Sequence, residues 1–449
     1  MIKKKWLFML FMGALMTATT ACGTGGSGKV ESKEKQTTKG GKTVLTLSIQ
    51  ESNPFYQALE KKFEAKYPNI DLQIKSYKNM GEKWEPNDYE KYKKTTNTAI
   101  LSGKGTDIIE VGNLPINEYV SKQVLLNMND YLEQDKTLNK SDVQMGVLNA
   151  MKLNGGIYTV PSGFSLRAFI GDGDVLKNTD VKIDEKNWSW KDFGEISKKL
   201  MQRAGKGNKD QRYALANNPP DVILQEMIVE SYTQFVDIAA KKANFDSPAF
   251  VELMQQIKKM FDEKIATSAP ADIGNQLFYS AVITSPADLI DGPHSFFDNP
   301  KLLLRPHDGQ ATGGMRIIPS TQFAIQVKSP AKDEAWKFMT FLLSEEAQSL
   351  QDRAGFSLLK SVNEKMLNDI QEKVKSGAYK LPNGNTAKVS DEEFTQFKQL
   401  INSADQYASL DGKVIYIVGE ESISFFSGQK SAEEVAKLIQ NRTTIYLNE

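Results

Sequence analysis

The sequence contains few of the residues that enzymes use for nucleophilic, acid–base or metal chemistry. Among 449 residues there is one cysteine, Cys22, and there are two histidines, His294 and His307. A lone cysteine excludes an internal disulfide. The two histidines lack the spacing of a zinc site and leave little for a Ser-His-Asp or Cys-His triad. We therefore expect no metal, no cofactor and no enzymatic activity, and a protein that binds its target without changing it.

The sequence also lacks a net charge and a second long apolar run. Lysine and arginine together number 56, as do aspartate and glutamate, so no strong field attracts nucleic acid. Beyond the N-terminus, no run of about 18 apolar residues is available to cross a membrane. The abundant carboxylates leave one enzymatic alternative open, a glycoside hydrolase that works with two acidic side chains.

The N-terminus has the order of a bacterial lipoprotein signal. Lysines and a short apolar run, residues 3–16, precede small residues that lead to Cys22. This order is typical of a secretory signal peptide. Residues 19–22, Thr-Thr-Ala-Cys, resemble a lipobox, whose cysteine is lipidated and becomes the first residue; the alternative is an ordinary signal with a buried cysteine. We predict a signal peptide over residues 1–21 and a lipid-anchored, flexible tether over residues 22–42.

From the end of the tether, strand and helix patterns alternate. Residues 43–49 and 70–77 alternate apolar and polar side chains, as half-buried strands do. Between them, residues 53–68 place apolar side chains at helical spacing behind an asparagine N-cap and a proline. Residues 89–103 are then predicted to form a helix, and residues 106–112 a strand. This rhythm indicates a parallel α/β sheet.

A second α/β unit is predicted downstream, because about 400 residues are too many for one compact core. A strand ends at Pro161. The further elements predicted from the same patterns are helices over residues 189–200, 247–266 and 329–348, and strands over residues 280–284 and 323–327.

Four stretches resemble, in order, segments of the family 1 extracellular solute-binding proteins of ABC importers, the maltose- and oligosaccharide-type lipoproteins. They are FEAKYPNIDLQI (63–74), AILSGKGTDIIEV (99–111), NWSWKDFGEISKKL (187–200) and AWKFMTFLLSEEAQ (335–348). Each stretch alone is an ordinary amphipathic pattern. Their order, together with the lipobox, extends the resemblance over nearly all of residues 22–360.

The resemblance implies an α/β fold of the periplasmic-binding-protein type (type II), with two lobes joined by a hinge. Each lobe is expected to be a sheet flanked by helices. The expected N-terminal lobe comprises residues 43–162 plus 282–328, and the C-terminal lobe residues 163–281 plus 329–449. The chain is expected to cross between lobes near residues 161–164, 280–284 and 328–330.

The resemblance also implies a function. A solute, in the first place a carbohydrate or oligosaccharide, would be captured by lobe closure and delivered to the permease subunits of an ABC importer. The protein would be a monomer, held by its lipid anchor at the extracytoplasmic face of the bacterial membrane. A peptide or polyamine remains open as the solute. The alternatives from other classes are a lipid-anchored glycoside hydrolase with paired carboxylates and an adhesion or assembly lipoprotein.

Candidate ligand contacts follow from the fold and from the chemistry of sugars. Ligands of such sheets lie at the carboxyl ends of strands and at the helix N-termini that follow, and sugars need aromatic faces and fixed polar groups. The predicted contacts are Glu51, Ser52, Asn53, Trp84, Asn113, Phe164, Arg167, Asn217, Asn218, Ser285, Gly314, Met315 and Arg316. Purely structural roles compete with this interpretation: an N-cap for Asn53, a turn for both Asn217 and Asn218, and hinge packing for Phe164.

Overall fold

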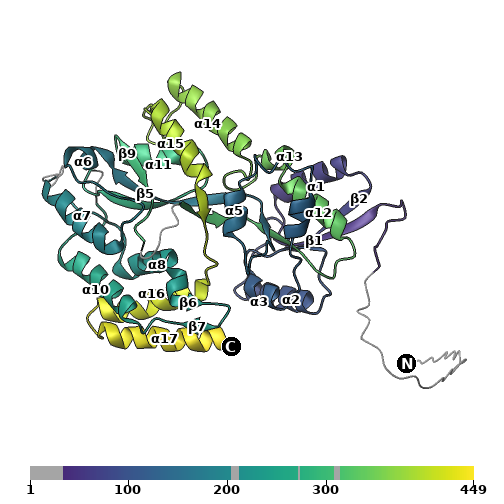
Figure 1. The fold of residues 1–449 in the computed structure, drawn as a ribbon, viewed down its shortest axis with the longest axis horizontal. Helices are drawn as coiled ribbons and strands as arrows, with labels where there is room; N and C mark the ends of the chain where they lie inside the picture. Colours follow the sequence, from purple (N-terminus) through teal and green to yellow (C-terminus); the bar gives the residue numbers. More distant parts are fainter. Residues whose placement is uncertain (1–33, 204–211, 272–273, 308–313) are drawn as a thin grey trace, which may run out of the picture.

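The computed structural model describes residues 34–203, 212–271, 274–307 and 314–449. The predicted signal peptide and Cys22 lie outside these residues. Two sheets, each flanked by helices, lie next to each other along the long axis of the molecule (Figure 1). We call them, with the helices that cover them, the first half and the second half. The expected two-part α/β architecture is confirmed. No helix among the described residues is both long and apolar enough to span a membrane.

The first sheet has the parallel arrangement that the alternating pattern predicts. Its strands lie in the order β2-β1-β3-β11-β4, with β1 parallel to β2 and β3 and with β11 antiparallel to β3 and β4. The strands are β1 (Thr43–Glu51), β2 (Ile70–Lys78), β3 (Ile108–Glu110), β4 (Val160–Pro161) and β11 (Gln322–Ile325). Because β1, β2 and β3 are parallel, their carboxyl ends share one edge of the sheet.

Helices bury the apolar side chains of this sheet. They are α1 (Pro54–Lys66), α2 (Asp88–Leu101), α3 (Ile116–Ser121), α4 (Asn129–Gln134), α5 (Met145–Ala150), α12 (Lys332–Leu342) and α13 (Glu345–Gln348). The ring of Phe63 on α1 packs edge-on against Phe338 and Phe341 of α12, at centroid distances of 5.5 Å. The late helix α12 therefore covers the first sheet, although β5, β8, β9 and β10 of the second sheet lie between α1 and α12 in sequence.

The second sheet is mostly antiparallel and is assembled from segments far apart in the chain. Its order is β12-β10-β5-β8, and β9 also pairs with β5. The strands are β5 (Phe164–Asp172), β8 (Phe278–Ile283), β9 (Pro300–Leu303), β10 (Met315–Pro319) and β12 (Ala404–Gln406), and a small separate hairpin consists of β6 (Val236–Asp237) and β7 (Lys242–Ala243). The central strand β5 pairs along both of its edges.

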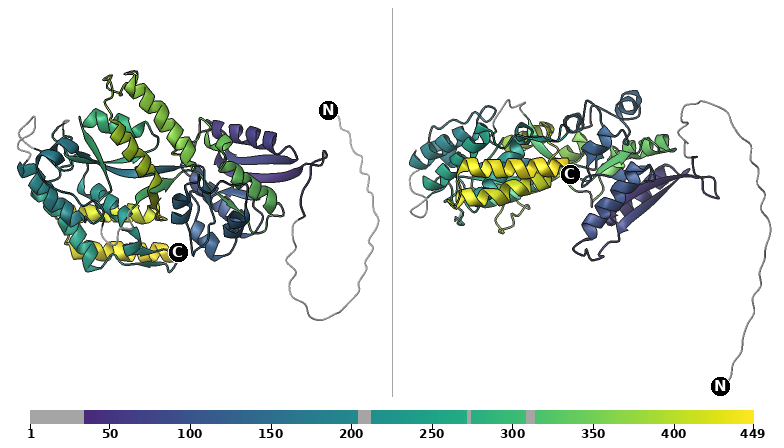
Figure 2. Two further views of the ribbon diagram at one scale, coloured as in Figure 1. Left: turned by 45° about the horizontal axis from the view of Figure 1, so that its top comes forward. Right: turned by 90° about the horizontal axis from the view of Figure 1, so that it is seen from below.

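Helices cover both faces of the second sheet (Figure 1, Figure 2). One face of β5 joins a core with α7 (Trp190–Arg203), α8 (Pro220–Glu230), α10 (Pro248–Asp262), α16 (Gly412–Phe426) and α17 (Ala432–Asn448). The other face lies against α11 (Asp288–Phe296) and α15 (Asp391–Asn402). The remaining helices are α6 (Gly173–Asn178), α9 (Tyr232–Phe235) and α14 (Lys360–Lys375).

The pairing of strands corrects part of the expected lobe division. Residues 282–319, expected in the N-terminal lobe, contribute β9, β10 and the end of β8 to the second sheet, because both edges of β5 accept strands from this segment. Residues 329–348, expected in the C-terminal lobe, form α12 and α13 on the first sheet.

The crossings between the halves shift accordingly. Near residues 161–164, where a crossing was expected, β4 of the first sheet ends at Pro161 and β5 of the second begins at Phe164. The crossings expected near 280–284 and 328–330 are wrong; the chain instead returns between β10 and β11, at residues 320–321. A third contact lies nearby, where Phe356 exchanges backbone hydrogen bonds of 3.1 and 2.6 Å with Phe164.

Candidate functional site

At the carboxyl edge of the first sheet, polar side chains bond to one another at the ends of β1 and β3. The backbone N–H of Gln50 donates to Oε2 of Glu110 (2.8 Å), and the side-chain oxygen of Gln50 accepts from Nδ2 of Asn113 (3.0 Å). Burial raises the pKa of the Glu110 carboxyl. Asn113 remains exposed, so it is the member of this group that is open to a ligand.

Trp84 lies over the same edge. Its indole N–H donates to Oε2 of Glu51 (2.8 Å), and its ring stacks on Tyr77 with the centroids 6.0 Å apart. Nζ of Lys78 lies 5.8 Å from the ring centroid and forms an ion pair with Asp88 (2.9 Å). The structure therefore brings Trp84 and Glu51 together, as the predicted site requires, and holds the half-buried indole in place.

Ser52 and Asn53 have structural partners at this edge. Oγ of Ser52 accepts from the backbone N–H of Met80 (2.8 Å) and so ties the segment after β2 to the end of β1. Oδ1 of Asn53 accepts from the N–H of Tyr56 (3.3 Å), which makes Asn53 the N-cap of α1. The side chain of Asn53 is nevertheless exposed.

In the second half, part of one face of the sheet lies beside the end of α8 and is only partly covered by it. Arg167 of β5 lies opposite Val282 of β8 and Arg316 of β10, and Ser165 lies opposite Ile318. Residues that face each other across neighbouring antiparallel strands point to the same side. Val282 and Ile318 are 49% and 38% exposed, although they lie in the sheet. We call these five residues the uncovered sheet face.

The arginines of the uncovered sheet face belong to a network of five charged side chains. Arg167 bonds to Glu226 (2.8 Å) and Glu230 (3.1 Å) of α8, Arg305 bonds to Glu226 (2.5 Å), and Arg316 bonds to Glu230 (2.7 Å). Arg316 also donates to the backbone oxygen of Glu230 (2.8 Å). The network thus anchors two neighbouring strands of the sheet to the last turn of α8.

Electrostatics explains why two arginines can face each other across neighbouring strands. Like charges in directly opposed positions are destabilising, but Glu230 lies between them, with a side chain only 5% exposed. Burial by itself would raise the pKa of Glu230. The guanidinium groups of Arg305, Arg316 and Arg167 outweigh burial and hold that pKa below its usual range. Glu230 is therefore an ionised, structural partner of the arginines.

Sequence reasoning identified Arg167 and Arg316 by location but missed Arg305, Glu226 and Glu230. A signal existed for the two glutamates, which are four residues apart and so lie on one face of a helix. No local pattern points to Arg305, which follows β9 and reaches the network only through the tertiary fold.

The other predicted residues divide into buried and turn positions. Phe164 is fully buried and packs on Phe356 with ring centroids 5.7 Å apart, which is the structural role weighed for it. Met315 is also fully buried. A Cβ atom at Gly314 would overlap Asp405 and the backbone of Ser403, so this glycine lets β10 approach β12.

Three predicted polar residues precede helices of the second half. The N–H of Asn217 donates to Ala269 O (3.1 Å), and its φ of +65° is that of a turn residue before α8. Asn217 is exposed and Asn218 half-buried. Oγ of Ser285 accepts from the N–H of Asp288 (3.4 Å) at the start of α11.

The edge of the first sheet and the uncovered sheet face flank the same crossing. Only five residues lie between Arg316 of β10 and Gln322 of β11. A Cβ atom at Gly112, next to Asn113, would lie 3.8 Å from the side chain of Gln322. The halves also meet where Nδ2 of Asn117 on α3 donates to Oγ of Ser409 (3.2 Å), just before α16.

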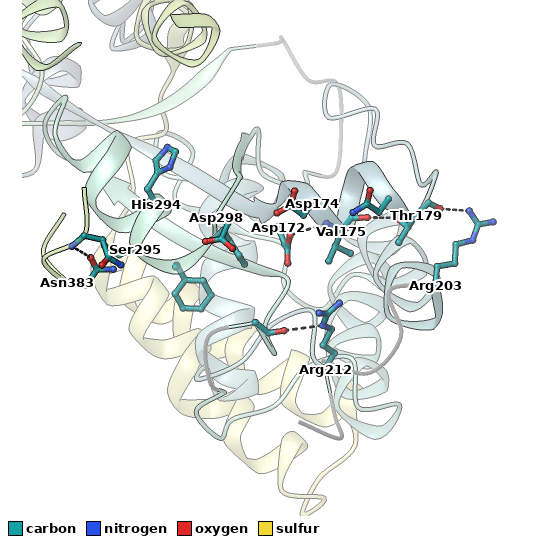
Figure 3. A pocket seen from close by; sticks show the side chains of 15 residues that line it. Asp172, Asp174, Val175, Thr179, Arg203, Arg212, His294, Ser295, Asp298 and Asn383 are labelled. Atoms are coloured by element: carbon teal, nitrogen blue, oxygen red, sulfur yellow. Dashed lines mark hydrogen bonds between the residues drawn. The ribbon is translucent and has the colours of Figure 1, made fainter. Parts of the chain in front are cut away.

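A pocket of about 510 Å³ lies elsewhere in the second half (Figure 3). Its polar groups are largely occupied by structural bonds: Oδ1 of Asp172 caps α6, Asp174 accepts from Asn299, and Arg203 donates to Thr179 O (2.7 Å). None of the predicted contacts lines this pocket. No group of three or more His, Cys, Asp or Glu side chains suited to a metal ion occurs in the described part of the chain.

Comparison with known proteins identifies the family. Residues 48–349, well over half of the chain, match the bacterial extracellular solute-binding proteins. A family 1 extracellular solute-binding protein from Alicyclobacillus acidocaldarius has a similar structure, with a TM-score of 0.60 and 17% identity over 91% of this chain and 99% of that one.

Two further structures share the fold. One is a periplasmic oligogalacturonide-binding protein from Yersinia enterocolitica (TM-score 0.59, 17% identity, 90% of this chain and 99% of that one). The other is the sugar-binding protein MalE from Xanthomonas citri (TM-score 0.57, 15% identity, 90% and 98%). The chain therefore belongs to the bacterial extracellular solute-binding proteins, a family that binds small solutes outside the cytoplasm for ABC transporters.

Proposed function

Starting from this family membership, we propose that the protein captures a carbohydrate between its two halves and delivers it to the permease of an ABC importer. The observation that carries the proposal is the uncovered sheet face, where polar side chains and exposed Val282 and Ile318 lie beside the crossing of the chain. The solute would lie between this face and the edge with Glu51, Trp84 and Asn113. Hinge bending at the crossings would then close the halves over it.

A carbohydrate suits the first half in particular. Sugar rings stack their C–H surfaces on aromatic side chains and use their hydroxyls for hydrogen bonds with fixed polar groups. Trp84, held by Glu51 and Tyr77, supplies an aromatic ring at the edge, and the exposed Asn113 supplies an amide. Proteins of similar fold are described as binding sugars and oligogalacturonide, which supports the same class of solute.

Binding without bond chemistry fits the carboxylates better than glycoside hydrolysis. A hydrolase of that kind needs one carboxyl group with a raised pKa to donate a proton, and a second, ionised carboxylate. Glu230 has a lowered pKa and is bonded to arginines, and Glu226 is shared between Arg167 and Arg305. Glu230 is therefore no proton donor, and Glu110, whose pKa burial raises, lies in the other half, where it accepts from the backbone N–H of Gln50.

The cellular setting is proposed from the sequence. Lipidation of Cys22 would hold the protein at the outer side of the bacterial cell membrane, and the residues after it would act as a tether. The tether is shorter than the expected residues 22–42, because Lys35 forms an ion pair with Glu334 (2.8 Å) and Gln36 O accepts from the N–H of Val44 (2.9 Å). Two acyl chains anchor a protein durably, whereas one does not. The protein would act as a monomer that docks on the permease subunits.

A thermal-unfolding screen against mono- and oligosaccharides, amino acids, polyamines and short peptides tests the proposal. A ligand at a hundred times its Kd adds about 2.7 kcal/mol to the native state, which shifts the midpoint by roughly 2 °C in so large a chain. We expect a shift with saccharides and their recovery unchanged on chromatography. Cleaved saccharides would favour the hydrolase, and a shift with peptides or polyamines alone would overturn the carbohydrate.

A further inference from the structure

We infer that the solute is an acidic saccharide, whose carboxylate docks on the arginine side of the uncovered sheet face. This inference rests on the proposed function and adds the charge of the solute to it. It starts from an imbalance: the network joins three arginines, Arg167, Arg305 and Arg316, to only two glutamates. The five side chains that contact one another thus carry one positive charge in excess.

The excess charge lies where a solute can reach it. The side chains of Arg167, Arg316 and Glu226 are 12%, 19% and 37% exposed, whereas those of Arg305 and Glu230 are only 4% and 5% exposed. The two accessible arginines are the pair that face each other across β5 and β10. The charges that a solute can reach are therefore these two arginines, beside Val282, and Glu226, which is bonded to Arg167; Glu230 is buried against its arginine partners.

Hydrogen-bond donors remain for an anion. Arg167 uses Nε and Nη2 for the glutamates, and Arg316 uses Nε and Nη2 for Glu230. The Nη1 group of each arginine makes no hydrogen bond within the described residues. A guanidinium fork matches the geometry of a carboxylate, and bonds between the two charged groups are stronger than bonds to a neutral hydroxyl.

The apolar members of the uncovered sheet face agree with this chemistry. They are Val282 and Ile318, both aliphatic. In the first half Trp84 supplies an aromatic ring for a sugar, and in the second half the arginines supply positive charge. An acidic saccharide matches both, with a sugar ring on the indole and a carboxylate on the arginines.

Titration calorimetry with matched sugars tests the inference on the wild-type protein. The probes are oligomers of galacturonate and of galactose, which differ by a carboxylate in place of the hydroxymethyl group, and the matched glucuronate and glucose pair. We expect the acidic member of a pair to bind about 30-fold more tightly, as for a partly buried charge pair. We also expect its affinity to fall between about 50 and about 500 mM salt.

Two variants at one exposed position distinguish an effect of charge on binding from an effect on folding. Val282 lies directly opposite Arg167 and is half-exposed, so the sheet tolerates a polar side chain there. The measured quantity is the ratio of affinities of Val282→Glu and Val282→Gln, which differ in charge alone. We expect the glutamate variant to bind the acidic probe about 10-fold more weakly than the glutamine variant. Arg442→Gln, which breaks a pair on the surface of α16 and α17, should change nothing.

The outcomes distinguish this inference from the proposed function. If the neutral member of each pair binds as tightly as the acidic one, the arginine–glutamate network has a structural role only. The inference of an acidic solute would then be wrong, while the proposal of carbohydrate capture would stand. Equal affinities of the two Val282 variants for the acidic probe would also overturn the placement of the carboxylate. If no saccharide of either charge binds, the proposed function itself falls.

Discussion

Glu110 in the first half and Glu230 in the second are both buried glutamates beside the candidate site, yet their pKa values shift in opposite directions. Glu110 meets a backbone N–H and no cation, so burial dominates and raises its pKa. Glu230 meets three guanidinium groups, which outweigh burial and lower its pKa. Glu110 is therefore held by hydrogen bonds, and Glu230 by the charge of its arginine partners. Substitutions on the two sides should respond differently.

The largest effect is expected from Glu230→Gln. The change leaves three buried or half-buried arginines with Glu226 alone, and removing one partner of a buried pair costs about 3–5 kcal/mol. Urea unfolding at pH 7 measures the loss. Glu226→Gln is the matched control on the same helix; because Glu226 is 37% exposed, water can solvate its partners and the cost should be clearly smaller. Equal losses in the two variants would contradict the central role of Glu230.

Wild-type protein and Glu230→Gln should also differ in how their free energy of unfolding changes in acid. A lowered folded-state pKa contributes stability above the unfolded pKa of about 4.3, and this stability is lost as the pH falls through the folded value. Wild-type protein should therefore lose free energy of unfolding below about pH 4, and Glu230→Gln should lack this part of the loss. Unfolding curves at a series of pH values measure the difference, which should shrink as the pH falls.

The two halves also differ in how much of their structure could be predicted from the sequence. Most of the first sheet is formed by the contiguous residues 43–161. Its strands could therefore be predicted from alternating patterns, and Glu51, Trp84 and Asn113 were among the contacts predicted in this half. In the second sheet, β5 pairs with β8, β9 and β10, and β12 pairs with β10, so the sheet combines segments that are far apart in the chain. An apolar alternation shows that residues 280–284 form a strand, but not which strand they pair with. For that reason the predicted lobe division was partly wrong, and Arg305 and both glutamates of α8 were not predicted.

A smaller effect is expected where the first half uses a single hydrogen bond. Trp84→Phe keeps an aromatic ring over the edge but removes the donor to Glu51. Because the partner carboxylate is half-exposed, the cost in unfolding free energy should be about 1 kcal/mol. The affinity for a saccharide should fall as well, because the ring is no longer fixed in place.

Trp336→Phe is the matched control for Trp84. Its indole also donates to a carboxylate, Oδ2 of Asp135 (2.8 Å), but it lies on α12 away from the candidate site. We expect a comparable loss of stability and an unchanged affinity, measured by urea unfolding and calorimetry. A fall in affinity in both variants would mean that the effect at Trp84 is one of general stability.

The N-cap of α1 allows the two roles of Asn53 to be separated. Asn53→Ala removes the cap and should cost about 1 kcal/mol of stability, whereas Asn53→Asp retains an acceptor for the N–H of Tyr56. If Asn53 only caps the helix, Asn53→Asp should bind the solute as the wild type does. A weaker affinity with unchanged stability would instead place the exposed side chain of Asn53 in contact with the solute.

The smallest effect is expected at Glu110, where the comparison began. A raised folded-state pKa means that Glu110 stabilises the fold fully only below its unfolded pKa, and that this stability is lost as the pH rises through the folded value. Glu110→Gln removes the buried charge and keeps an oxygen to accept from the N–H of Gln50. The variant should therefore equal or exceed wild-type stability at pH 7, by less than about 1 kcal/mol, and the difference should vanish toward pH 4. A loss of several kcal/mol, as at Glu230, would mean that a cation also holds Glu110, and that charge stabilises both sides of the site.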